Sequence, residues 1–107
     1  MYRVTKRDGS ITEFHIAKIG NAITRAFEAV GRQQHPSVIE LLALRVTAEF
    51  EPKIRNGLIS VEDIQDCVER VLSEAGYSDV AKAYILYRKQ REKLRNVGST
   101  LLNYKEL

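Results

Sequence analysis

The stretch V-T-K-R-D-G-S-I-T, residues 4–12, is the part of this sequence that predicts most about its structure. Asp8-Gly9 favours a tight turn, because glycine takes positive φ at little cost. Residues 3–5 and 11–14 on either side suit two short paired strands. Lys6 and Arg7 are then neighbouring cations at the lip of a hairpin, an arrangement that suits a polyanionic ligand such as a triphosphate.

Two helices are expected between the hairpin and residue 52. Apolar residues recur at helical spacing from Ile16 to Val30, and Gly31 is the expected stop. Pro36 can open the second helix in its first turn, and Pro52 ends it. The inner face of this second helix is predicted to carry Val38, Leu41, Leu42, Val46 and Phe50.

Two more helices are expected in the second half of the chain. Residues 58–59 are too few for an independent strand, but they can add a third strand to the hairpin. Ser60, with Asp63 three residues on, resembles a capping box at the start of the third helix. The fourth helix begins at residue 78 or 79 and is expected to end at Gly98.

The expected fold class is therefore α+β, a four-helix bundle capped by a small β-hairpin or three-stranded sheet. Each helix has only one apolar face, so the helices need one another and the sheet to bury it. A length of 107 residues suits one domain with a single core. We expect this domain to cover residues 1–96, with residues 97–107 as a linker or tail.

Charge is distributed unevenly along the chain. The net charge is +3, but residues 1–36 carry +3, residues 37–79 carry −5 and residues 80–107 carry +5. If the two basic ends meet in space, they form one positive site. The alternatives are that the basic C-terminal stretch is a solvated helix face or part of a nucleic-acid-binding module. A purely structural oligomerisation bundle is a third possibility for the whole chain.

The absence of several sequence motifs excludes some classes of binding and catalytic site. The sequence has no P-loop, no dinucleotide fingerprint and no H-E-x-x-H. A single cysteine, Cys67, excludes an internal disulfide framework and a multi-cysteine zinc site. No run of apolar residues is long enough to span a membrane. We therefore assign no catalytic residue and no metal ligand, and we expect a cytoplasmic protein.

Four blocks of this sequence resemble the ATP-cone family. In family order over residues 2–95, they are V-T-K-R-D-G-S (4–10) with Phe14, then Lys18-Ile19, I-S-V-E-D-I-Q (59–65) and V-A-K-A-Y-I-L-Y-R (80–88). The resemblance implies a helical bundle capped by a three-stranded sheet that binds ATP or dATP, with Mg²⁺. It also implies control of the overall activity of a ribonucleotide reductase, with ATP favouring the active state and dATP the inactive one, commonly through changed oligomerisation.

The same resemblance implies a nucleotide site. Its phosphate contacts would be Lys6, Arg7 and Lys18. Its adenine contacts would be Val4, Ile19 and Ala22, and the nucleoside side would be closed by Val61, Ile64 and Gln65. The residues that reach the triphosphate or a second nucleotide would be Tyr87, Arg88 and Arg91. The site also includes two positions where the reductase family often carries Glu and Asn or Asp, here Thr12 and His15.

The parent protein is expected to be an enzyme, although this chain alone is not. Residues 91–107 resemble the linker into the catalytic barrel of an anaerobic, glycyl-radical ribonucleoside-triphosphate reductase. That resemblance implies a catalytic domain as partner, nucleotide-dependent self-association, and no nucleic acid or membrane. The alternatives are a class I or II large subunit, a free-standing cone, and the cone of a transcriptional repressor of reductase genes. Such repressors carry a zinc ribbon before the cone, which a chain with one cysteine cannot form.

Overall fold

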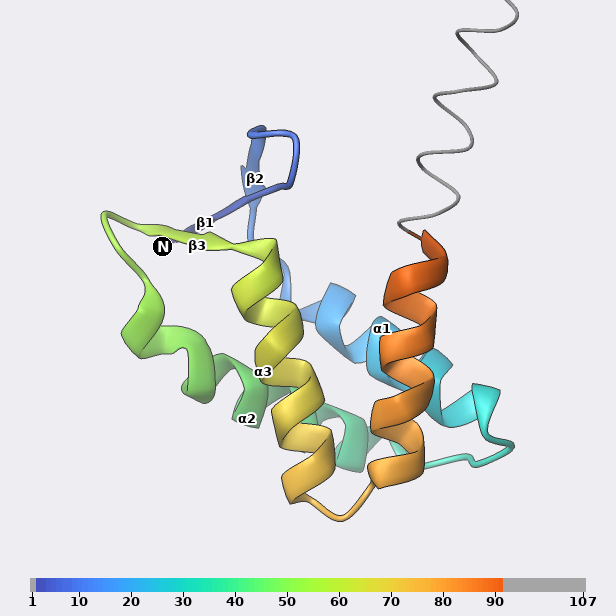
Figure 1. Ribbon diagram of the computed structural model, residues 1–107. Helices are drawn as coiled ribbons and strands as arrows, with labels where there is room; N and C mark the ends of the chain where they lie inside the picture. The colour runs from blue at the N-terminus through green and yellow to red at the C-terminus, as the bar shows by residue number, and fades with distance from the viewer. Residues whose placement is uncertain (1, 92–107) are drawn as a thin grey trace, which may run out of the picture.

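The computed structural model describes residues 2–91. In chain order it contains β1 (Arg3–Thr5), β2 (Ile11–Glu13), α1 (Ile16–Ala29), α2 (Pro36–Phe50), the 3-10 turn η1 (Glu51–Lys53), β3 (Leu58–Ser60) and α3 (Val61–Glu74). A further helix, called here the C-terminal helix, is described over 78–91. The sheet lies at one end of the helices (Figure 1). The α+β class, a helical bundle capped by a small sheet, is therefore confirmed, while Gly98 and the 97–107 tail lie outside the described residues.

The sheet is mixed and has the strand order β2-β1-β3. The central strand, β1, is antiparallel to β2, with Val4 opposite Thr12, and parallel to β3, with Val4 opposite Ile59. The predicted turn forms at Gly9, whose φ is 87°. The Asp8 carboxylate accepts a hydrogen bond from the Ser10 amide at 2.9 Å, which stabilises this turn. The predicted hairpin is confirmed, and the third strand is one residue longer than expected.

The start of α3 follows the sheet without a loop. Ser60 is both the last residue of β3 and the N-cap of α3, and its hydroxyl accepts a hydrogen bond from the Asp63 amide at 3.1 Å. Such a cap satisfies one of the amides that the first turn of a helix leaves without a partner. The sheet and the beginning of α3 are therefore held together as one unit.

The core lies where α2 packs between α1 and α3. Its fully buried side chains come from all four helices and are Ile23, Phe27, Val46, Phe50, Cys67, Val68, Val71, Leu72 and Val80. At the sheet end, the rings of Tyr2 and Phe14 lie 5.9 Å and 5.5 Å from the ring of Phe50. This aromatic contact fixes the first strand and the entry to α1 against the end of α2.

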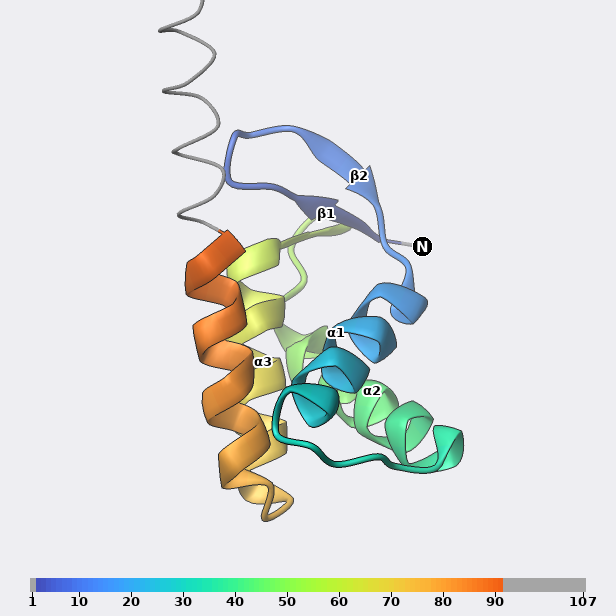
Figure 2. The same ribbon diagram turned by 90° about the vertical axis from the view of Figure 1, so that its right-hand side faces the viewer.

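The C-terminal helix runs beside α3 and returns the chain to the hairpin end (Figure 2). Its first turn is tied to the loop that follows α1, because Arg32 Nη1 lies 3.1 Å from Asp79 Oδ1. Residues near both ends of the described chain therefore meet at one end of the bundle. In the part of the chain described here, no helix is long and apolar enough to cross a membrane.

The prediction that Leu41 belongs to the buried face of α2 is wrong. Leu41 is 60% exposed, whereas its neighbour Leu42 is only 4% exposed. The buried stripe of α2 is Leu42, Ala43, Val46 and Phe50. Since successive residues are about 100° apart around a helix, Leu41 falls outside this stripe and faces solvent with Leu44.

This difference gives a matched pair of substitutions. We expect Leu42→Ala to lower the free energy of unfolding by about 2–4 kcal/mol, because it leaves a cavity between α2 and its neighbours. Leu41→Ala, the same chemical change one residue earlier, should cost less than about 0.5 kcal/mol. Urea denaturation of both variants tests this, and equal losses would contradict the orientation of α2.

Candidate functional site

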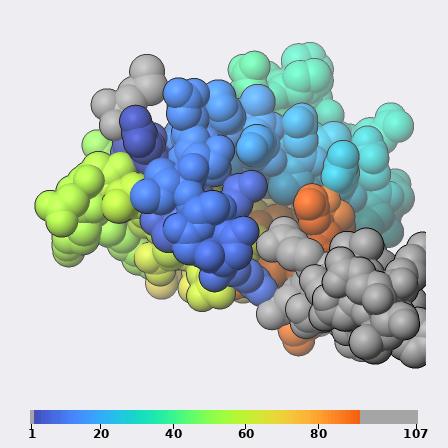
Figure 3. Space-filling view, turned by 90° about the horizontal axis from the view of Figure 1, so that it is seen from above, coloured from blue at the N-terminus to red at the C-terminus, as the bar shows by residue number. Residues whose placement is uncertain are grey.

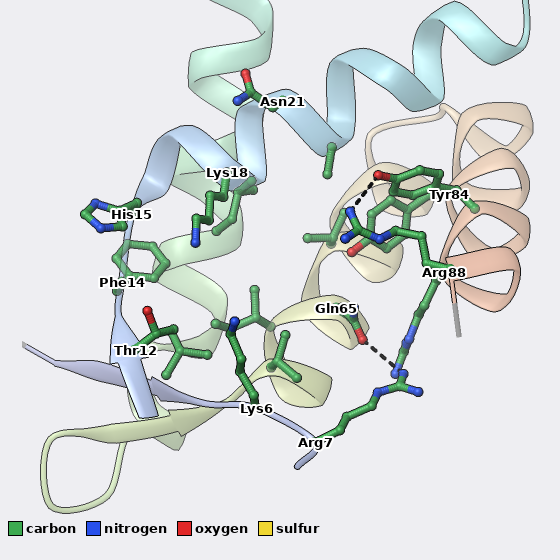
Figure 4. A pocket seen from close by; sticks show the side chains of 18 of the residues that line it. Lys6, Arg7, Thr12, Phe14, His15, Lys18, Asn21, Gln65, Tyr84 and Arg88 are labelled. Atoms are coloured by element: carbon green, nitrogen blue, oxygen red, sulfur yellow. Dashed lines mark hydrogen bonds between the residues drawn. The ribbon is translucent and has the colours of Figure 1, made fainter. Parts of the chain in front are cut away.

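A cavity of about 470 Å³ lies beneath the hairpin, between α1, the start of α3 and the C-terminal helix (Figure 4). This volume is within the range of small-molecule sites. Seen from above, the hairpin and α1 in blue cover this end of the molecule, and the C-terminal helix in orange reaches the surface next to them (Figure 3). The cavity is thus built from segments far apart in the sequence.

The structure brings together all fourteen residues that the sequence predicts for a nucleotide site. Each of them lines this cavity: Val4, Lys6, Arg7, Thr12, His15, Lys18, Ile19, Ala22, Val61, Ile64, Gln65, Tyr87, Arg88 and Arg91. Their contacts with a ligand stay predictions.

Six lining residues were not predicted for the site, namely Glu13, Phe14, Asn21, Arg25, Val68 and Tyr84. Helical spacing could have identified two of them, because Asn21 and Arg25 follow Lys18 at three and seven residues on α1 and share its face. Tyr84 belongs both to the lining of the cavity and to the core. It is 5% exposed, and burial raises its pKa to about 12.

The floor of the cavity is apolar. Val4, Ile19 and Ile64 are each less than 8% exposed and come from β1, α1 and α3. Ala22 and Val61 are half-buried beside them. A flat aromatic ring that settled on this floor would lose contact with water over much of its area, which favours binding.

The rim of the cavity is strongly cationic. Six lining side chains carry positive charge, namely Lys6, Arg7, Lys18, Arg25, Arg88 and Arg91, against one carboxylate, Glu13. Lys6 and Lys18 lie on one side and Arg7 and Arg88 on the other (Figure 4). Like charges gathered around one space repel each other, so an anion placed among them would be attracted to all of them.

The beginning of α1 adds to the positive potential. Its N-cap, His15, makes no side-chain capping hydrogen bond, and the first turn holds no acidic residue. The N-terminus of a helix carries partial positive charge and exposed amide groups, both of which favour an anion. Lys18 stands in this same turn and lines the cavity.

Two arginines converge on one tyrosine at the edge of the cavity. Arg25 Nη1, from α1, and Arg91 Nη1, from the C-terminal helix, donate to Tyr87 Oη at 2.9 Å and 3.0 Å. The hydrogen bond from Arg91 and then that from Arg25 lower the pKa of Tyr87. Tyr87 therefore holds two cations close together and bridges two helices.

The other two arginines of the rim contact α3. Arg7 Nη2 donates to Gln65 Oε1 at 3.5 Å, and Arg7 Nε lies 3.5 Å from Glu62 Oε1. Arg88 Nη1 lies closer to two carboxylates of α3, 3.0 Å from Asp66 Oδ1 and 2.9 Å from Glu69 Oε1. Within residues 2–91 no group of three His, Cys, Asp or Glu side chains could hold a metal ion.

Comparison with known proteins gives a family match over nearly the whole described chain. The family model of the ATP cone domain matches residues 2–93. A vitamin B12-dependent ribonucleoside-diphosphate reductase of Mycobacterium tuberculosis is 41% identical over 92% of this chain. The alpha subunit of a Chlamydia pneumoniae ribonucleoside-diphosphate reductase is 38% identical over 86%. An anaerobic ribonucleoside-triphosphate reductase of Haemophilus influenzae is 37% identical over 94%.

These relatives are much longer than this chain. The matched region covers 14% of the Mycobacterium tuberculosis protein, 9% of the Chlamydia pneumoniae protein and 14% of the Haemophilus influenzae protein. The similarity therefore concerns the cone alone and not the remainder of those enzymes.

The environment of Tyr87 leads to a prediction on its ionisation. Tyr87 should lose its proton at a lower pH than an ordinary tyrosine, because two guanidinium groups stabilise the phenolate. Arg91→Gln should move this transition to higher pH. Titration followed by tyrosinate absorbance measures it, and Tyr87→Phe should remove the earliest transition. Persistence of that transition in Tyr87→Phe would contradict the assignment.

Proposed function

Since this chain belongs to the ATP-cone family, we propose that it binds ATP and dATP in the cavity and regulates a ribonucleotide reductase. In this proposal the chain is the regulatory domain of a reductase large subunit, and it does not itself catalyse the reaction. The observation that carries the proposal is the cavity itself, in which an apolar floor adjoins a rim of six cations. A purine ring and a triphosphate need these two surfaces side by side.

The cavity favours one orientation of the nucleotide. Adenine would pack on the floor against Ile19 and Ile64, which are almost fully buried. The phosphates would extend toward Lys6 and Lys18, neither of which makes an ion pair within residues 2–91. Tyr87, together with Arg88 and Arg91, would contact the far end of the triphosphate or a second nucleotide. Mg²⁺ would arrive bound to the phosphates.

Regulation would act through the elements that the nucleotide joins. A bound triphosphate would neutralise cations on the hairpin, on α1 and on the C-terminal helix at once, and so would favour the arrangement in which all three lie close. ATP and dATP differ only at the 2′ position, so opposite effects require a different contact there. We propose that the response is a change in self-association of the parent protein.

The class of the parent reductase stays a prediction. The stretch at 91–107 favours the anaerobic triphosphate enzyme, whereas the relatives include diphosphate reductases as well. A cytoplasmic location likewise stays a prediction. Binding of nucleic acid is the less favoured alternative, because Arg25, Arg88 and Arg91 line a cavity of nucleotide size.

Calorimetric titration of this chain with ATP and with dATP, in the presence of Mg²⁺, tests the proposal. Micromolar or tighter binding supports it, and the stoichiometry distinguishes one nucleotide from two. Mass measurement in the same samples shows whether the excised domain changes its association state. A folded sample that binds neither nucleotide would contradict the proposal.

A lysine pair tests the phosphate contacts. Lys6→Ala should weaken ATP binding roughly tenfold or more while adenosine binding is retained, because a charge-assisted hydrogen bond is worth about 1.5–3 kcal/mol. Lys82→Ala removes the same charge from an exposed position on the C-terminal helix outside the cavity. The control should therefore bind ATP as the unaltered chain does. Equal weakening by both would indicate a general effect of charge instead of a phosphate site.

An alanine pair on α1 tests the base contacts. Ala22→Leu should weaken both ATP and adenosine by about tenfold or more, because overfilling a packed site costs of order 1–3 kcal/mol. Ala29→Leu adds the same atoms at an exposed position on the same helix and should have little effect. Titration of both variants with both ligands measures this. Unchanged adenosine binding in Ala22→Leu would exclude the floor as the base site.

A further inference from the structure

Arg88 is held by two carboxylates on the neighbouring helix. Its Nη1 atom donates to Asp66 Oδ1 at 3.0 Å and to Glu69 Oε1 at 2.9 Å. Asp66 and Glu69 are three residues apart on α3, so they lie on the same face of that helix, toward the C-terminal helix. The Arg88 side chain is only 18% exposed. Its guanidinium is therefore fixed in one place before any ligand arrives.

The same nitrogen, Nη1, donates both hydrogen bonds. A guanidinium has five N–H groups in one rigid plane, and three of them are on Nη2 and Nε. Those three make no hydrogen bond to another residue within 2–91, while Arg88 also lines the cavity. The carboxylates thus fix the plane of the guanidinium without using the donors that a phosphate would need.

The pairing also offsets the cost of burying the charge of Arg88. Burial alone would lower the pKa of the guanidinium, but the hydrogen bonds to Asp66 and Glu69 outweigh this effect and raise it. A permanently charged, preoriented arginine can bind a phosphate through two parallel hydrogen bonds.

We propose that Asp66 and Glu69 are positioning residues, which hold Arg88 ready for the phosphate groups of the nucleotide. This inference rests on the proposed function. The inferred effect is opposite to the one that charge alone would cause, because two negative charges near the site strengthen the binding of a polyanion. Water screens the direct repulsion between the ligand and Asp66, whose side chain is 60% exposed. The charge of Glu69, whose side chain is 26% exposed, is offset by its ion pair with Arg88 at 2.9 Å. Affinity for the nucleotide increases because the Arg88 side chain is already ordered, so binding does not have to restrict it.

The test is a calorimetric titration of an Asp66→Ala, Glu69→Ala double variant with ATP and with adenosine. We expect affinity for ATP to fall roughly three- to tenfold, because binding must then order the Arg88 side chain, while adenosine binding is unchanged. Charge removal alone would tighten ATP binding instead. Unchanged or tighter binding of ATP by the double variant would overturn the inference.

Two controls separate positioning from other effects. Glu13→Gln removes the one carboxylate that lines the cavity itself; because Glu13 makes no ion pair with a rim arginine within residues 2–91 and its side chain is 81% exposed, ATP binding should be unchanged or slightly tighter. In an Arg88→Gln background, the carboxylate substitutions should cause no further loss, because their effect passes through Arg88. A further loss of similar size in that background would contradict the inference.

The outcomes also distinguish this inference from the proposed function. Failure of the unaltered chain to bind ATP would overturn both, whereas normal binding with an unaffected double variant would overturn only the role of Asp66 and Glu69. If the double variant does not fold, as judged by circular dichroism, the single variants Asp66→Asn and Glu69→Gln decide. Each keeps an acceptor oxygen but removes a charge that holds Arg88, so each should weaken ATP binding when Arg88 is present and not in the Arg88→Gln background. Unchanged or tighter ATP binding by both single variants would overturn the inference.

Discussion

The parallel pairing of β1 with β3 is the interaction on which the rest of the structure depends. The Arg3 amide donates to the Gly57 carbonyl at 2.8 Å, and Val4 lies opposite Ile59. Because Ser60 ends β3 and caps α3, this pairing places the hairpin directly over the beginning of α3. The cationic tip at Lys6 and Arg7 and the apolar floor at the start of α3 meet for this reason. Without it, the hairpin would have no fixed relation to the helices, since a two-stranded ribbon is marginally stable by itself.

The protein combines an apolar core with a cavity rim whose positive charges repel one another when no anion is bound. The buried side chains are apolar throughout residues 2–91. The rim instead gathers positive charge from the hairpin, α1 and the C-terminal helix. Asp66 and Glu69 of α3 offset part of this charge through their ion pairs with Arg88. Tyr87 offsets another part by accepting hydrogen bonds from two guanidiniums. An arrangement of this kind is stabilised by a bound anion, so its stability is coupled to ligand concentration.

Local sequence patterns predicted most of the fold. The Asp8-Gly9 turn, the Ser60 cap and the apolar periodicity of the helices depend on neighbours in the chain, and each is found in the structure. Leu41 was misplaced because an apolar residue beside a buried stripe looks the same in sequence as one within it. The hairpin signal pointed to Lys6 and Arg7 and the charge distribution to two basic chain ends, whereas the full set of fourteen predicted site residues came from the family resemblance. Contacts between distant segments, such as that between Arg25 and Tyr87, depend on how the helices pack and leave no signal in sequence spacing.

The claim at the centre of this account is that one nucleotide contacts elements from both ends of the chain. Backbone amide chemical shifts recorded by NMR during titration with Mg²⁺ and ATP test it most directly. The account predicts simultaneous shifts in the hairpin, in the first two turns of α1, at the start of α3 and along 84–91, all with one saturation curve. Shifts confined to a single element, or to the exposed face of α2, would contradict it.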